Sequence, residues 1–374
     1  MASPEHAQTT ADLMGQYGPF AQRKGGLYRN QRAPQRLDDM INWQRDNLNF
    51  IFDQTPKEVR DQTKEWYVGG RVLVDEAAKR YGITPEQAAA VYAALSPKKD
   101  WYQNVYIGDQ LMDTLKGAGP RDWTPEMSQT LDTDILPGLS QLYKQKAEAI
   151  RGRGLADIND DVEKALWVRT FEQSKPDRTY PFILPSGARE GIVTTATGDP
   201  RVPTWANTLA MVNAVRAIED GSLANLSRTI GGQHKVRSFY NNLFAPQSLR
   251  GDTTVDTHAV AAGFLSPFGL SDTPVLDNLG ARPTSSITGV KGTYPVQREA
   301  LVRAAADQGV LPREMQSITW ESVRGLFNNK SDAAKNYAKR VWEDYSRGLI
   351  GQGQAQRMIL EGLGGINPPT WLNR

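Results

Sequence analysis

The sequence predicts a mainly α-helical protein with one small irregular or β-hairpin insertion. Three observations support this fold class. Apolar residues recur at helical spacing along most of the chain from Leu37 onward. Segments of this kind begin with a polar capping residue followed by proline, as in Thr84-Pro85. Residues 179–204 instead mix β-branched residues with Gly and Pro, which is typical of a short hairpin or a loop.

The polar segment 1–38 comes first and carries a basic patch that includes Arg23, Lys24 and Arg29. Its composition predicts an arm that is poorly ordered or draped over the surface. An arm that contacts phosphates is the alternative.

The helical pattern begins at Leu37, and Pro56 starts a second helix that runs toward Tyr81.

The next predicted helices follow in chain order. Residues 87–95 are nearly all small and apolar, so this helix is expected to be buried. Two glycines, Gly69 and Gly70, are expected to weaken the middle of the preceding helix. Further helices are predicted at residues 139–150, 205–220, 223–230, 235–244, 296–309, from Pro312, and at 332–349.

The end of the buried helix is a candidate contact for nucleic acid. Lys98 and Lys99 lie beside Trp101 and Tyr102, so phosphate contact and base stacking are available in one place. The alternative is a proline that ends a helix beside a solvated lysine pair, with both aromatics in the core. The sequence leaves these two readings open.

Two segments lack helical periodicity and are too long to be simple connectors. Residues 179–204 are a candidate lid or substrate loop, in which Arg189 could hold a phosphate or a carboxylate or be a surface charge. Residues 266–293 are rich in Pro, Gly, Ser and Thr and form a second predicted loop insertion.

The segment 231–263 combines a glycine turn with a later acidic residue. Gly231 and Gly232 allow positive φ, and Lys235 opens the next helix, whose free N–H groups attract phosphate. Asp256 precedes a small apolar run and is predicted to be a helix N-cap. A carboxylate in this position stays ionised near neutral pH, so Asp256 is a candidate fixed anion, base or cation stabiliser.

Composition limits the chemistry. The chain has 44 Lys+Arg against 42 Asp+Glu, so a DNA site must be local. It has no cysteine, which excludes disulfides and thiolate metal sites, and three histidines make a histidine-rich metal site improbable. No cofactor is identified; magnesium stays open as a cofactor, although no carboxylate cluster marks a site for it. Without an apolar run long enough for a membrane span, we expect a cytoplasmic protein.

The sequence Gly-Gly-Gln-His-Lys at 231–235, followed by Val-Asp-Thr-His-Ala at 255–259, resembles the helix-hairpin-helix DNA glycosylase superfamily. The resemblance implies a helical bundle of that type over residues 39–374, a single domain in two lobes. It implies that Asp256 is the essential aspartate and that Lys235 stands where lyase-type members have their Schiff-base lysine. The hairpin departs from the usual L-P-G-x-G pattern, and the absence of cysteine excludes the iron–sulfur cluster of some members.

The sequence Lys-Val-Arg-Ser-Phe-Tyr-Asn-Asn-Leu at 235–243 is similar to a bacteriophage branch of this superfamily, the α-glutamyl/putrescinyl-thymine pyrophosphorylase or amino acid:DNA transferase group. Gln316, Trp320 and Arg324, spaced Q-x-x-x-W-x-x-x-R, also resemble this branch, without an assigned role. The implied reaction transfers an amino acid to the 5-methylene of pyrophosphorylated 5-hydroxymethyluracil in DNA and releases pyrophosphate.

The implied partners are DNA with a modified base and an amino acid, in the host cytoplasm if the protein is phage-encoded. An N-glycosylase with AP lyase activity, and a non-catalytic DNA-binding protein of the same fold, are the alternatives. The candidate catalytic residues are Asp256, Lys235 and His258, the last as a second proton carrier. The candidate DNA-binding residues are Gly231, Gly232, Gln233, His234, Arg237, Lys98 and Lys99. The candidate base or substrate pocket is Ser96, Trp101, Tyr102, Asn104, Tyr240, Asn241 and Arg189.

Overall fold

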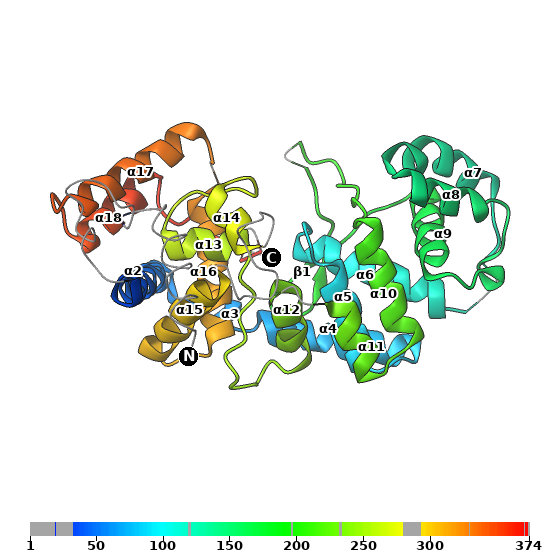
Figure 1. Cartoon of the computed structure of the whole chain (residues 1–374), viewed down its shortest axis with the longest axis horizontal. Helices are drawn as coiled ribbons and strands as arrows, with labels where there is room; N and C mark the ends of the chain where they lie inside the picture. Colours follow the sequence, from blue (N-terminus) through cyan, green and yellow to red (C-terminus); the bar gives the residue numbers. More distant parts are fainter. Residues whose placement is uncertain are drawn as a thin grey trace. The chain divides into compact units, whose positions relative to one another are not determined.

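The computed structural model describes Pro19 and residues 33–118, 121–195, 197–231, 234–279, 293–328, 330–369 and 371–372. These residues are mainly helical and include one two-stranded antiparallel sheet, which confirms the predicted mainly-α class (Figure 1). The chain divides into two compact units. Unit 1 comprises residues 1–67 and 232–374, and unit 2 comprises residues 68–231. Each is described by itself below.

Unit 1 is built around a core formed by α2, α13, α15 and α16. The helix α2 begins at Ala33, which lies inside the predicted arm 1–38. Of the residues before Ala33, the structure describes Pro19 alone. The helices α17 and α18 pack against each other. The helices of this unit are α2 (Ala33–Gln54), α3 (Lys57–Thr63), α12 (His234–Phe244), α13 (Thr257–Phe264), α14 (Thr273–Asn278), α15 (Tyr294–Gln308), α16 (Pro312–Leu326), α17 (Asp332–Ser346) and α18 (Gln352–Gly362).

The helix α13 lies at the centre of unit 1 because its side chains are small. Residues 259–262 are all fully or almost fully buried. A Cβ atom at Gly263 would lie 2.8 Å from Oε1 of Gln297 and 2.9 Å from Oε1 of Gln44. Glycine therefore lets α13 approach α2 and α15 closely, and this contact fixes the position of the residues at the start of α13.

Unit 2 is organised around α10, which packs against α5 and α9. The helix α5 is buried from Gln87 to Leu95, as predicted from its small apolar residues. The elements of this unit are α4 (Trp66–Tyr81, whose first two residues belong to unit 1), α5 (Pro85–Leu95), α6 (Trp101–Lys116), α7 (Pro125–Thr130), the π-helix η2 (Leu131–Ile135), the 3-10 helices η3 (Leu136–Gly138) and η4 (Leu155–Asp157), α8 (Gln141–Ala149), α9 (Asp161–Ser174), β1 (Phe182–Ile183), β2 (Arg189–Glu190), α10 (Thr208–Glu219) and α11 (Leu223–Ile230).

The predicted helix starts are confirmed where the sequence supplies a capping residue. Thr84 Oγ1 accepts a hydrogen bond from the Gln87 amide, and Gln87 Oε1 accepts one from the Thr84 amide. Thr124 caps α7 through the amide of Met127. The caps satisfy amide groups that the first turn of a helix leaves without partners.

The segment 179–204 contains the predicted hairpin, in which Phe182 pairs with Glu190 and Ile183 with Arg189. The turn of this hairpin lies against α4, because a Cβ atom at Gly69 would collide with the carbonyl oxygen of Pro185. The helix α4 is continuous through Gly69, so this glycine permits a close contact and does not interrupt the helix.

The helices α6, α14 and α18 were not predicted. Residues 101–116 form α6, although residues 101–104 were read only as a candidate contact for DNA. The predicted loop 266–293 contains α14, and residues 280–292 lie outside the described part of the chain. The helix α18 begins at Gln352, and its N-cap residue Gly351 supplies no side-chain cap, so no local signal marks its start. Among the described residues, no helix has the length and apolar character that crossing a bilayer requires.

Candidate functional site

Asp256 is held by three N–H donors at the start of α13. Its Oδ1 accepts hydrogen bonds from the amides of His258 at 2.9 Å and Ala259 at 3.0 Å. Its Oδ2 accepts a hydrogen bond of 2.9 Å from Nε1 of Trp320. The predicted N-cap is confirmed. Bonds to both oxygens fix the plane of the carboxylate, which is the first requirement for a catalytic anion.

Gln316, Trp320 and Arg324 lie along one face of α16, which accounts for their spacing. Trp320 is the member of this face that contacts Asp256. The His258 and Trp320 rings meet in a T-shaped arrangement with their centroids 5.5 Å apart. The Arg324 guanidinium lies over the same indole, with its carbon 4.6 Å from the ring centroid. The sequence pattern by itself gave these three residues no role. In the structure, Trp320 lies between the carboxylate of Asp256 and the guanidinium of Arg324.

Gln316 takes part in a second polar contact of unit 1. Its Oε1 accepts a hydrogen bond of 2.7 Å from the hydroxyl of Tyr67. Burial raises the pKa of Tyr67, so this hydroxyl stays protonated and donates. Asn242 of α12 lies nearby and donates to Thr254 at 3.2 Å. The first bond ties α16 to the start of α4, and the second ties α12 to the chain just before Asp256.

His258 follows Asp256 by two residues and is neutral near pH 7. Burial is the main cause that lowers its pKa to about 4; the charge of Asp256 opposes this shift, and the nearby cations Lys330, Arg324 and Lys235 add to it. Its Nδ1 is buried and has no hydrogen-bond partner among the described residues. A neutral imidazole with a free nitrogen can accept or donate one proton, but it carries no charge of its own.

Lys235 is the second residue of α12 and is partly buried. Burial lowers the pKa of its ammonium group, and the charge of Asp256 acts in the opposite direction. A lysine with a lowered pKa is deprotonated more readily and is then a nucleophile. Asp256, His258 and Lys235 thus lie in one electrostatic neighbourhood of unit 1, although they come from two helices.

His234 and Tyr294 hold the chain that leads into Asp256. The Tyr294 hydroxyl donates to the carbonyl oxygen of Thr253 at 2.6 Å and accepts from the amide of Val255 at 3.1 Å. Burial raises the pKa of Tyr294 to about 12. The His234 ring stacks on Tyr294 at a centroid distance of 5.1 Å. His234, predicted to bind DNA, therefore packs against a tyrosine that positions the segment 253–255.

The glycine turn and α12 contain other residues that were predicted to bind DNA or the base. Gly231 ends α11 with a φ of 70°, as predicted from its position. Gly232 and Gln233 lie outside the described residues. Arg237 is exposed on α12, and Tyr240 stacks on Phe244 with ring centroids 6.0 Å apart. The side chain of Asn241 is partly buried.

The predicted contact at residues 96–104 belongs to unit 2. Tyr102 is buried against Phe182, with ring centroids 5.3 Å apart, and Asn104 donates to the carbonyl oxygen of Tyr92 at 3.0 Å. Ser96 is buried, and Trp101 is partly buried. Lys99 donates to the Thr204 hydroxyl at 2.9 Å, and Lys98 is exposed with a φ of 60°. Tyr102 and Asn104 are thus part of the core of unit 2.

Arg189 also belongs to unit 2 and binds two carboxylates of the chain itself. Its guanidinium lies 2.9 Å from Oε2 of Glu76 and 3.0 Å from Oδ2 of Asp109. Tyr92 donates to the other oxygen of Asp109 at 2.6 Å. Burial raises the pKa of Asp109. This network attaches the hairpin to α4 and α6, which gives Arg189 a structural role.

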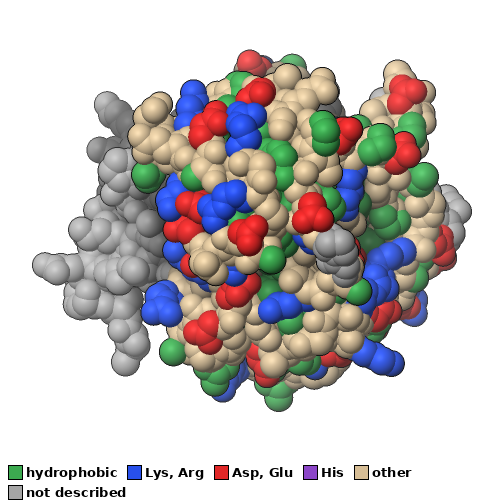
Figure 2. All heavy atoms as spheres, turned by 90° about the vertical axis from the view of Figure 1, so that its right-hand side faces the viewer, with side chains coloured by type: hydrophobic (Ala, Val, Ile, Leu, Met, Phe, Trp, Pro, Cys, Tyr) green, Lys and Arg blue, Asp and Glu red, His purple; other side chains and the backbone are tan. Residues whose placement is uncertain are grey.

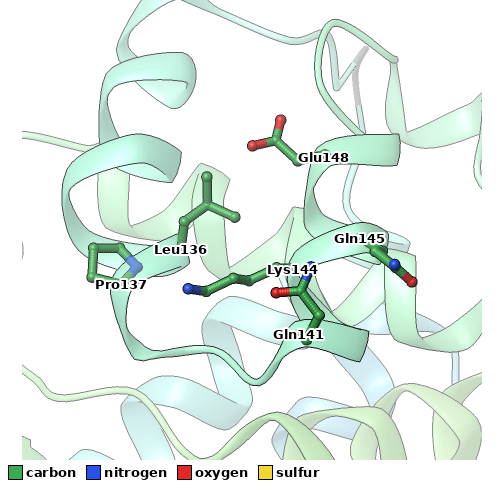
Figure 3. Close-up of a pocket in the computed structure, with 6 residues that line it drawn as sticks. All are labelled: Leu136, Pro137, Gln141, Lys144, Gln145 and Glu148. Carbon is green, nitrogen blue, oxygen red and sulfur yellow. The ribbon is translucent and has the colours of Figure 1, made fainter.

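Unit 2 carries an open hollow of about 670 Å³ between η3 and α8 (Figure 3). The labelled side chains include Lys144 and Glu148, with Leu136 and Pro137 on the opposite side. On the face of the molecule shown in Figure 2, Lys and Arg side chains alternate with Asp and Glu, without a large patch of one sign. The hollow lacks a set of reactive groups comparable to that around Asp256.

The described residues contain no group of three or more His, Cys, Asp or Glu side chains that could hold a metal ion. The candidate site therefore consists of Asp256 with its donors, the partly buried Lys235, and the His258 ring beside Trp320.

Residues 34–144 match the model of a family of unknown function, DUF7178. No curated protein and no solved structure matches the chain. The matched residues contain α2 to α7 and the segment 96–104, but not Asp256, Lys235 or His258.

Proposed function

We propose that this protein modifies a base in DNA, by transferring an amino acid to the 5-methylene carbon of pyrophosphorylated 5-hydroxymethyluracil. The observation that carries the proposal is the fixed carboxylate of Asp256, which accepts three N–H bonds and lies near the partly buried Lys235. The order of a helix, a glycine with positive φ, a basic helix and an aspartate-capped helix supports a helix-hairpin-helix glycosylase-like ancestry. The substrate would be phage DNA in the cytoplasm of the host.

The reaction needs a leaving group with negative charge and an amine that loses a proton. The bond between the methylene carbon and the pyrophosphate oxygen breaks, and the electron pair leaves with the pyrophosphate. The amine nitrogen forms the new bond to this carbon and releases one proton. Asp256 is the base that accepts this proton, and its charge stabilises the cation-like carbon. Lys235 balances the charge that develops on the pyrophosphate.

The test uses DNA that carries either 5-hydroxymethyluracil or its pyrophosphoryl ester, with and without amino acids. Mass analysis of the nucleosides distinguishes an added amino acid, an abasic site and an unchanged base. We expect an added mass only with the pyrophosphoryl ester and an amino acid. An abasic site would support the glycosylase alternative, and an unchanged base would leave only a DNA-binding role.

The matched variants are Asp256→Asn and Asp252→Asn. Asp252 lies in the loop before Asp256 and makes none of the three contacts that hold the catalytic carboxylate. We expect turnover to fall by at least about a hundredfold in Asp256→Asn, the size typical of losing an acid–base group. DNA binding should survive, and Asp252→Asn should remain active. Full turnover in Asp256→Asn would remove this residue from the mechanism.

Lys235 supports one second candidate, an N-glycosylase with AP lyase activity. Burial lowers the pKa of its ammonium group, as a Schiff-base lysine requires. In this reaction the amine attacks the sugar carbon that bears the base, and the base leaves with the electron pair of the broken bond and takes up the proton that the amine loses. The sugar ring then opens to the imine that borohydride reduces. Borohydride would trap the covalent adduct with DNA in the native protein and in Lys339→Ala, an exposed lysine of α17. The adduct should be absent in Lys235→Ala, and an adduct that persists there would exclude Lys235 as the nucleophile.

A further inference from the structure

The chain between α12 and α13 presents an apolar side chain to solvent at the tip of a loop. Leu249 is 85% exposed, and it is the most exposed large apolar side chain among the described residues. A single exposed leucine is common on protein surfaces, so exposure alone indicates no function. What distinguishes Leu249 is how its loop, residues 245–255, is held.

Hydrogen bonds hold the backbone on both sides of Leu249. Nη1 of Arg313 donates to the carbonyl oxygen of Ser248 at 3.0 Å. Nη2 of Arg298 donates to the carbonyl oxygen of Arg250, also at 3.0 Å. These two anchors come from α16 and α15, which both contribute to the core of unit 1. Bonds to two packed helices therefore fix Leu249 in its exposed position.

The same loop leads directly to the candidate site. Gly251 is buried with a φ of 73°, a conformation that favours glycine. The Tyr294 hydroxyl then bonds the backbone on both sides of Thr254. Leu249 precedes Asp256 by seven residues, and both ends of this stretch are anchored within unit 1. The leucine and the proposed catalytic carboxylate are therefore held in a fixed arrangement.

The surface of the loop carries more positive than negative charge. Arg250 is exposed and Arg298 is partly buried, whereas Asp252, the carboxylate within the loop, is partly buried. Within the described part of the chain, Arg298 contacts a backbone carbonyl, and neither arginine is paired with a carboxylate. Glu299, which follows Arg298 in α15, lies 3.1 Å from Arg303 instead. Two such cations beside a fixed apolar side chain complement the phosphates and stacked bases of nucleic acid.

We propose that this loop contacts duplex DNA, with Leu249 inserted between stacked bases and with Arg250 and Arg298 against the flanking phosphates. Apolar side chains inserted at a base step unstack it, which lowers the cost of turning a nucleotide out of the duplex. A loop that is fixed before binding loses little conformational entropy on insertion. Guanidinium groups bind phosphate oxygens in pairs. Arg313 is buried and acts as a positioning residue that holds the loop.

This inference deepens the proposed function and rests on it, because the proposed reaction requires access to a base that is stacked in a duplex. It adds the group that opens the stack, which lies outside the set of Asp256, Lys235 and His258. Contact with DNA needs no turnover, so the loop and the reaction are tested separately.

The probe for insertion is a DNA duplex with one 5-hydroxymethyluracil opposite 2-aminopurine, whose fluorescence rises when it is unstacked. Leu249→Ala and Leu249→Met are compared with the native full chain, and Leu349→Ala removes another exposed leucine of unit 1 as the control. We expect the fluorescence rise at saturating protein to fall about fivefold or more in Leu249→Ala, because alanine is too short to separate two bases. Leu249→Met should keep most of the rise, and Leu349→Ala all of it. Because both leucines are exposed, these substitutions leave the core packing unchanged.

The arginines are tested by their effect on affinity for the same duplex, measured by fluorescence anisotropy at several salt concentrations. Arg250→Gln and Arg298→Gln should each bind about three- to tenfold more weakly and lower the slope of log affinity against log salt by about one. Arg340→Gln is the control, because it removes an exposed arginine of α17. Leu249→Ala should keep the salt slope of the native chain.

Three results would overturn the proposal. A full fluorescence rise with Leu249→Ala, or no rise with the native chain, would exclude insertion. Unchanged affinity and salt slope in both arginine variants would exclude the phosphate contacts. Self-association of the native chain that Leu249→Ala abolishes, measured by sedimentation, would assign the loop to a contact between copies of the chain.

These outcomes are separable from the proposed function. The same measurements are made in Asp256→Asn, which should give the native rise in fluorescence. If insertion fails while Asp256-dependent base modification is observed, only the role of the loop is wrong. If insertion is observed but no DNA substrate is modified, only the proposed reaction is wrong.

Discussion

The indole N–H of Trp320 donates a hydrogen bond of 2.9 Å to Oδ2 of Asp256, although the two residues are 64 positions apart in the chain. The other oxygen of this carboxylate caps α13 through two amides. The cap alone leaves Oδ2 without a fixed direction. The bond from Trp320 therefore completes the orientation of the proposed catalytic group.

Replacing Trp320 with phenylalanine should remove this bond and keep an aromatic ring beside His258. A hydrogen bond to a charged group contributes about 1.5–3 kcal/mol, so we expect the free energy of unfolding to fall by that amount. Urea denaturation measures this loss. Trp342→Phe is the control, because its indole N–H donates to the neutral carbonyl oxygen of Leu265 at 3.4 Å and its loss should cost less. Equal losses in both variants would contradict the assigned role of Trp320.

The lowered pKa of His258 predicts how stability depends on pH. The unfolded chain binds a proton at this residue near pH 6.5, whereas the folded chain binds it near pH 4. Below pH 6.5 the unfolded state therefore holds more protons, and the folded state loses stability as the pH falls toward 4. The loss from this residue is at most about 3 kcal/mol. In His258→Gln, the decrease between pH 7 and pH 4.5 should be smaller, and an identical decrease would contradict the prediction.

Arg189 should stabilise unit 2 through its two carboxylate partners. Arg189→Met leaves Asp109, which is mostly buried, without its cation, and we expect the free energy of unfolding to decrease by about 1–3 kcal/mol. Arg201→Met is the control in the same segment, because Arg201 is half exposed and lies 3.8 Å from Asp100. Its removal should change stability little. A larger loss in Arg201→Met than in Arg189→Met would refute this account of the hairpin.

Gly69 should be intolerant of a side chain because the hairpin turn lies against it. In Gly69→Ala the new methyl group meets the carbonyl oxygen of Pro185, so either α4 or the turn must move. Overpacking of this kind costs about 1–3 kcal/mol, which exceeds the gain in helix propensity of about 1 kcal/mol. Thermal denaturation compares this variant with Gly138→Ala, where no atom lies within 4 Å of the new Cβ. A stabilised Gly69→Ala chain would mean that the turn does not make this contact.

Local chemistry explains which elements could be predicted. The helix α11 was predicted with its observed bounds, because Ser222 caps its start and Gly231 ends it. The cap at Asp256 was predicted for the same reason. The helix α18 was missed because Gly351 gives no side-chain cap. The reading of Tyr102 stayed open in the sequence, because an aromatic residue next to lysines is equally compatible with stacking on a base and with packing in a core.

The residues of the candidate site also divide into those that the sequence could identify and those that it could not. Lys235, Asp256 and His258 could be named from residue types and spacing. Trp320, Arg324 and Lys330 could not be assigned to that site, since their proximity depends on how α16 and the chain after it pack beside α13. The pattern of Gln316, Trp320 and Arg324 was the available signal, and its helical spacing alone did not indicate what the shared face contacts.

The sequence by itself determined the helical class, the capped helix starts and the aspartate that begins α13. These features depend on hydrogen bonds and periodicities within a few residues. Only the tertiary structure decided that an indole N–H orients Asp256, that His258 is neutral near pH 7, and that the charge of Asp256 acts on both Lys235 and Lys330. The physical reason is that desolvation and charge proximity arise from packing between distant segments, which no local sequence pattern specifies.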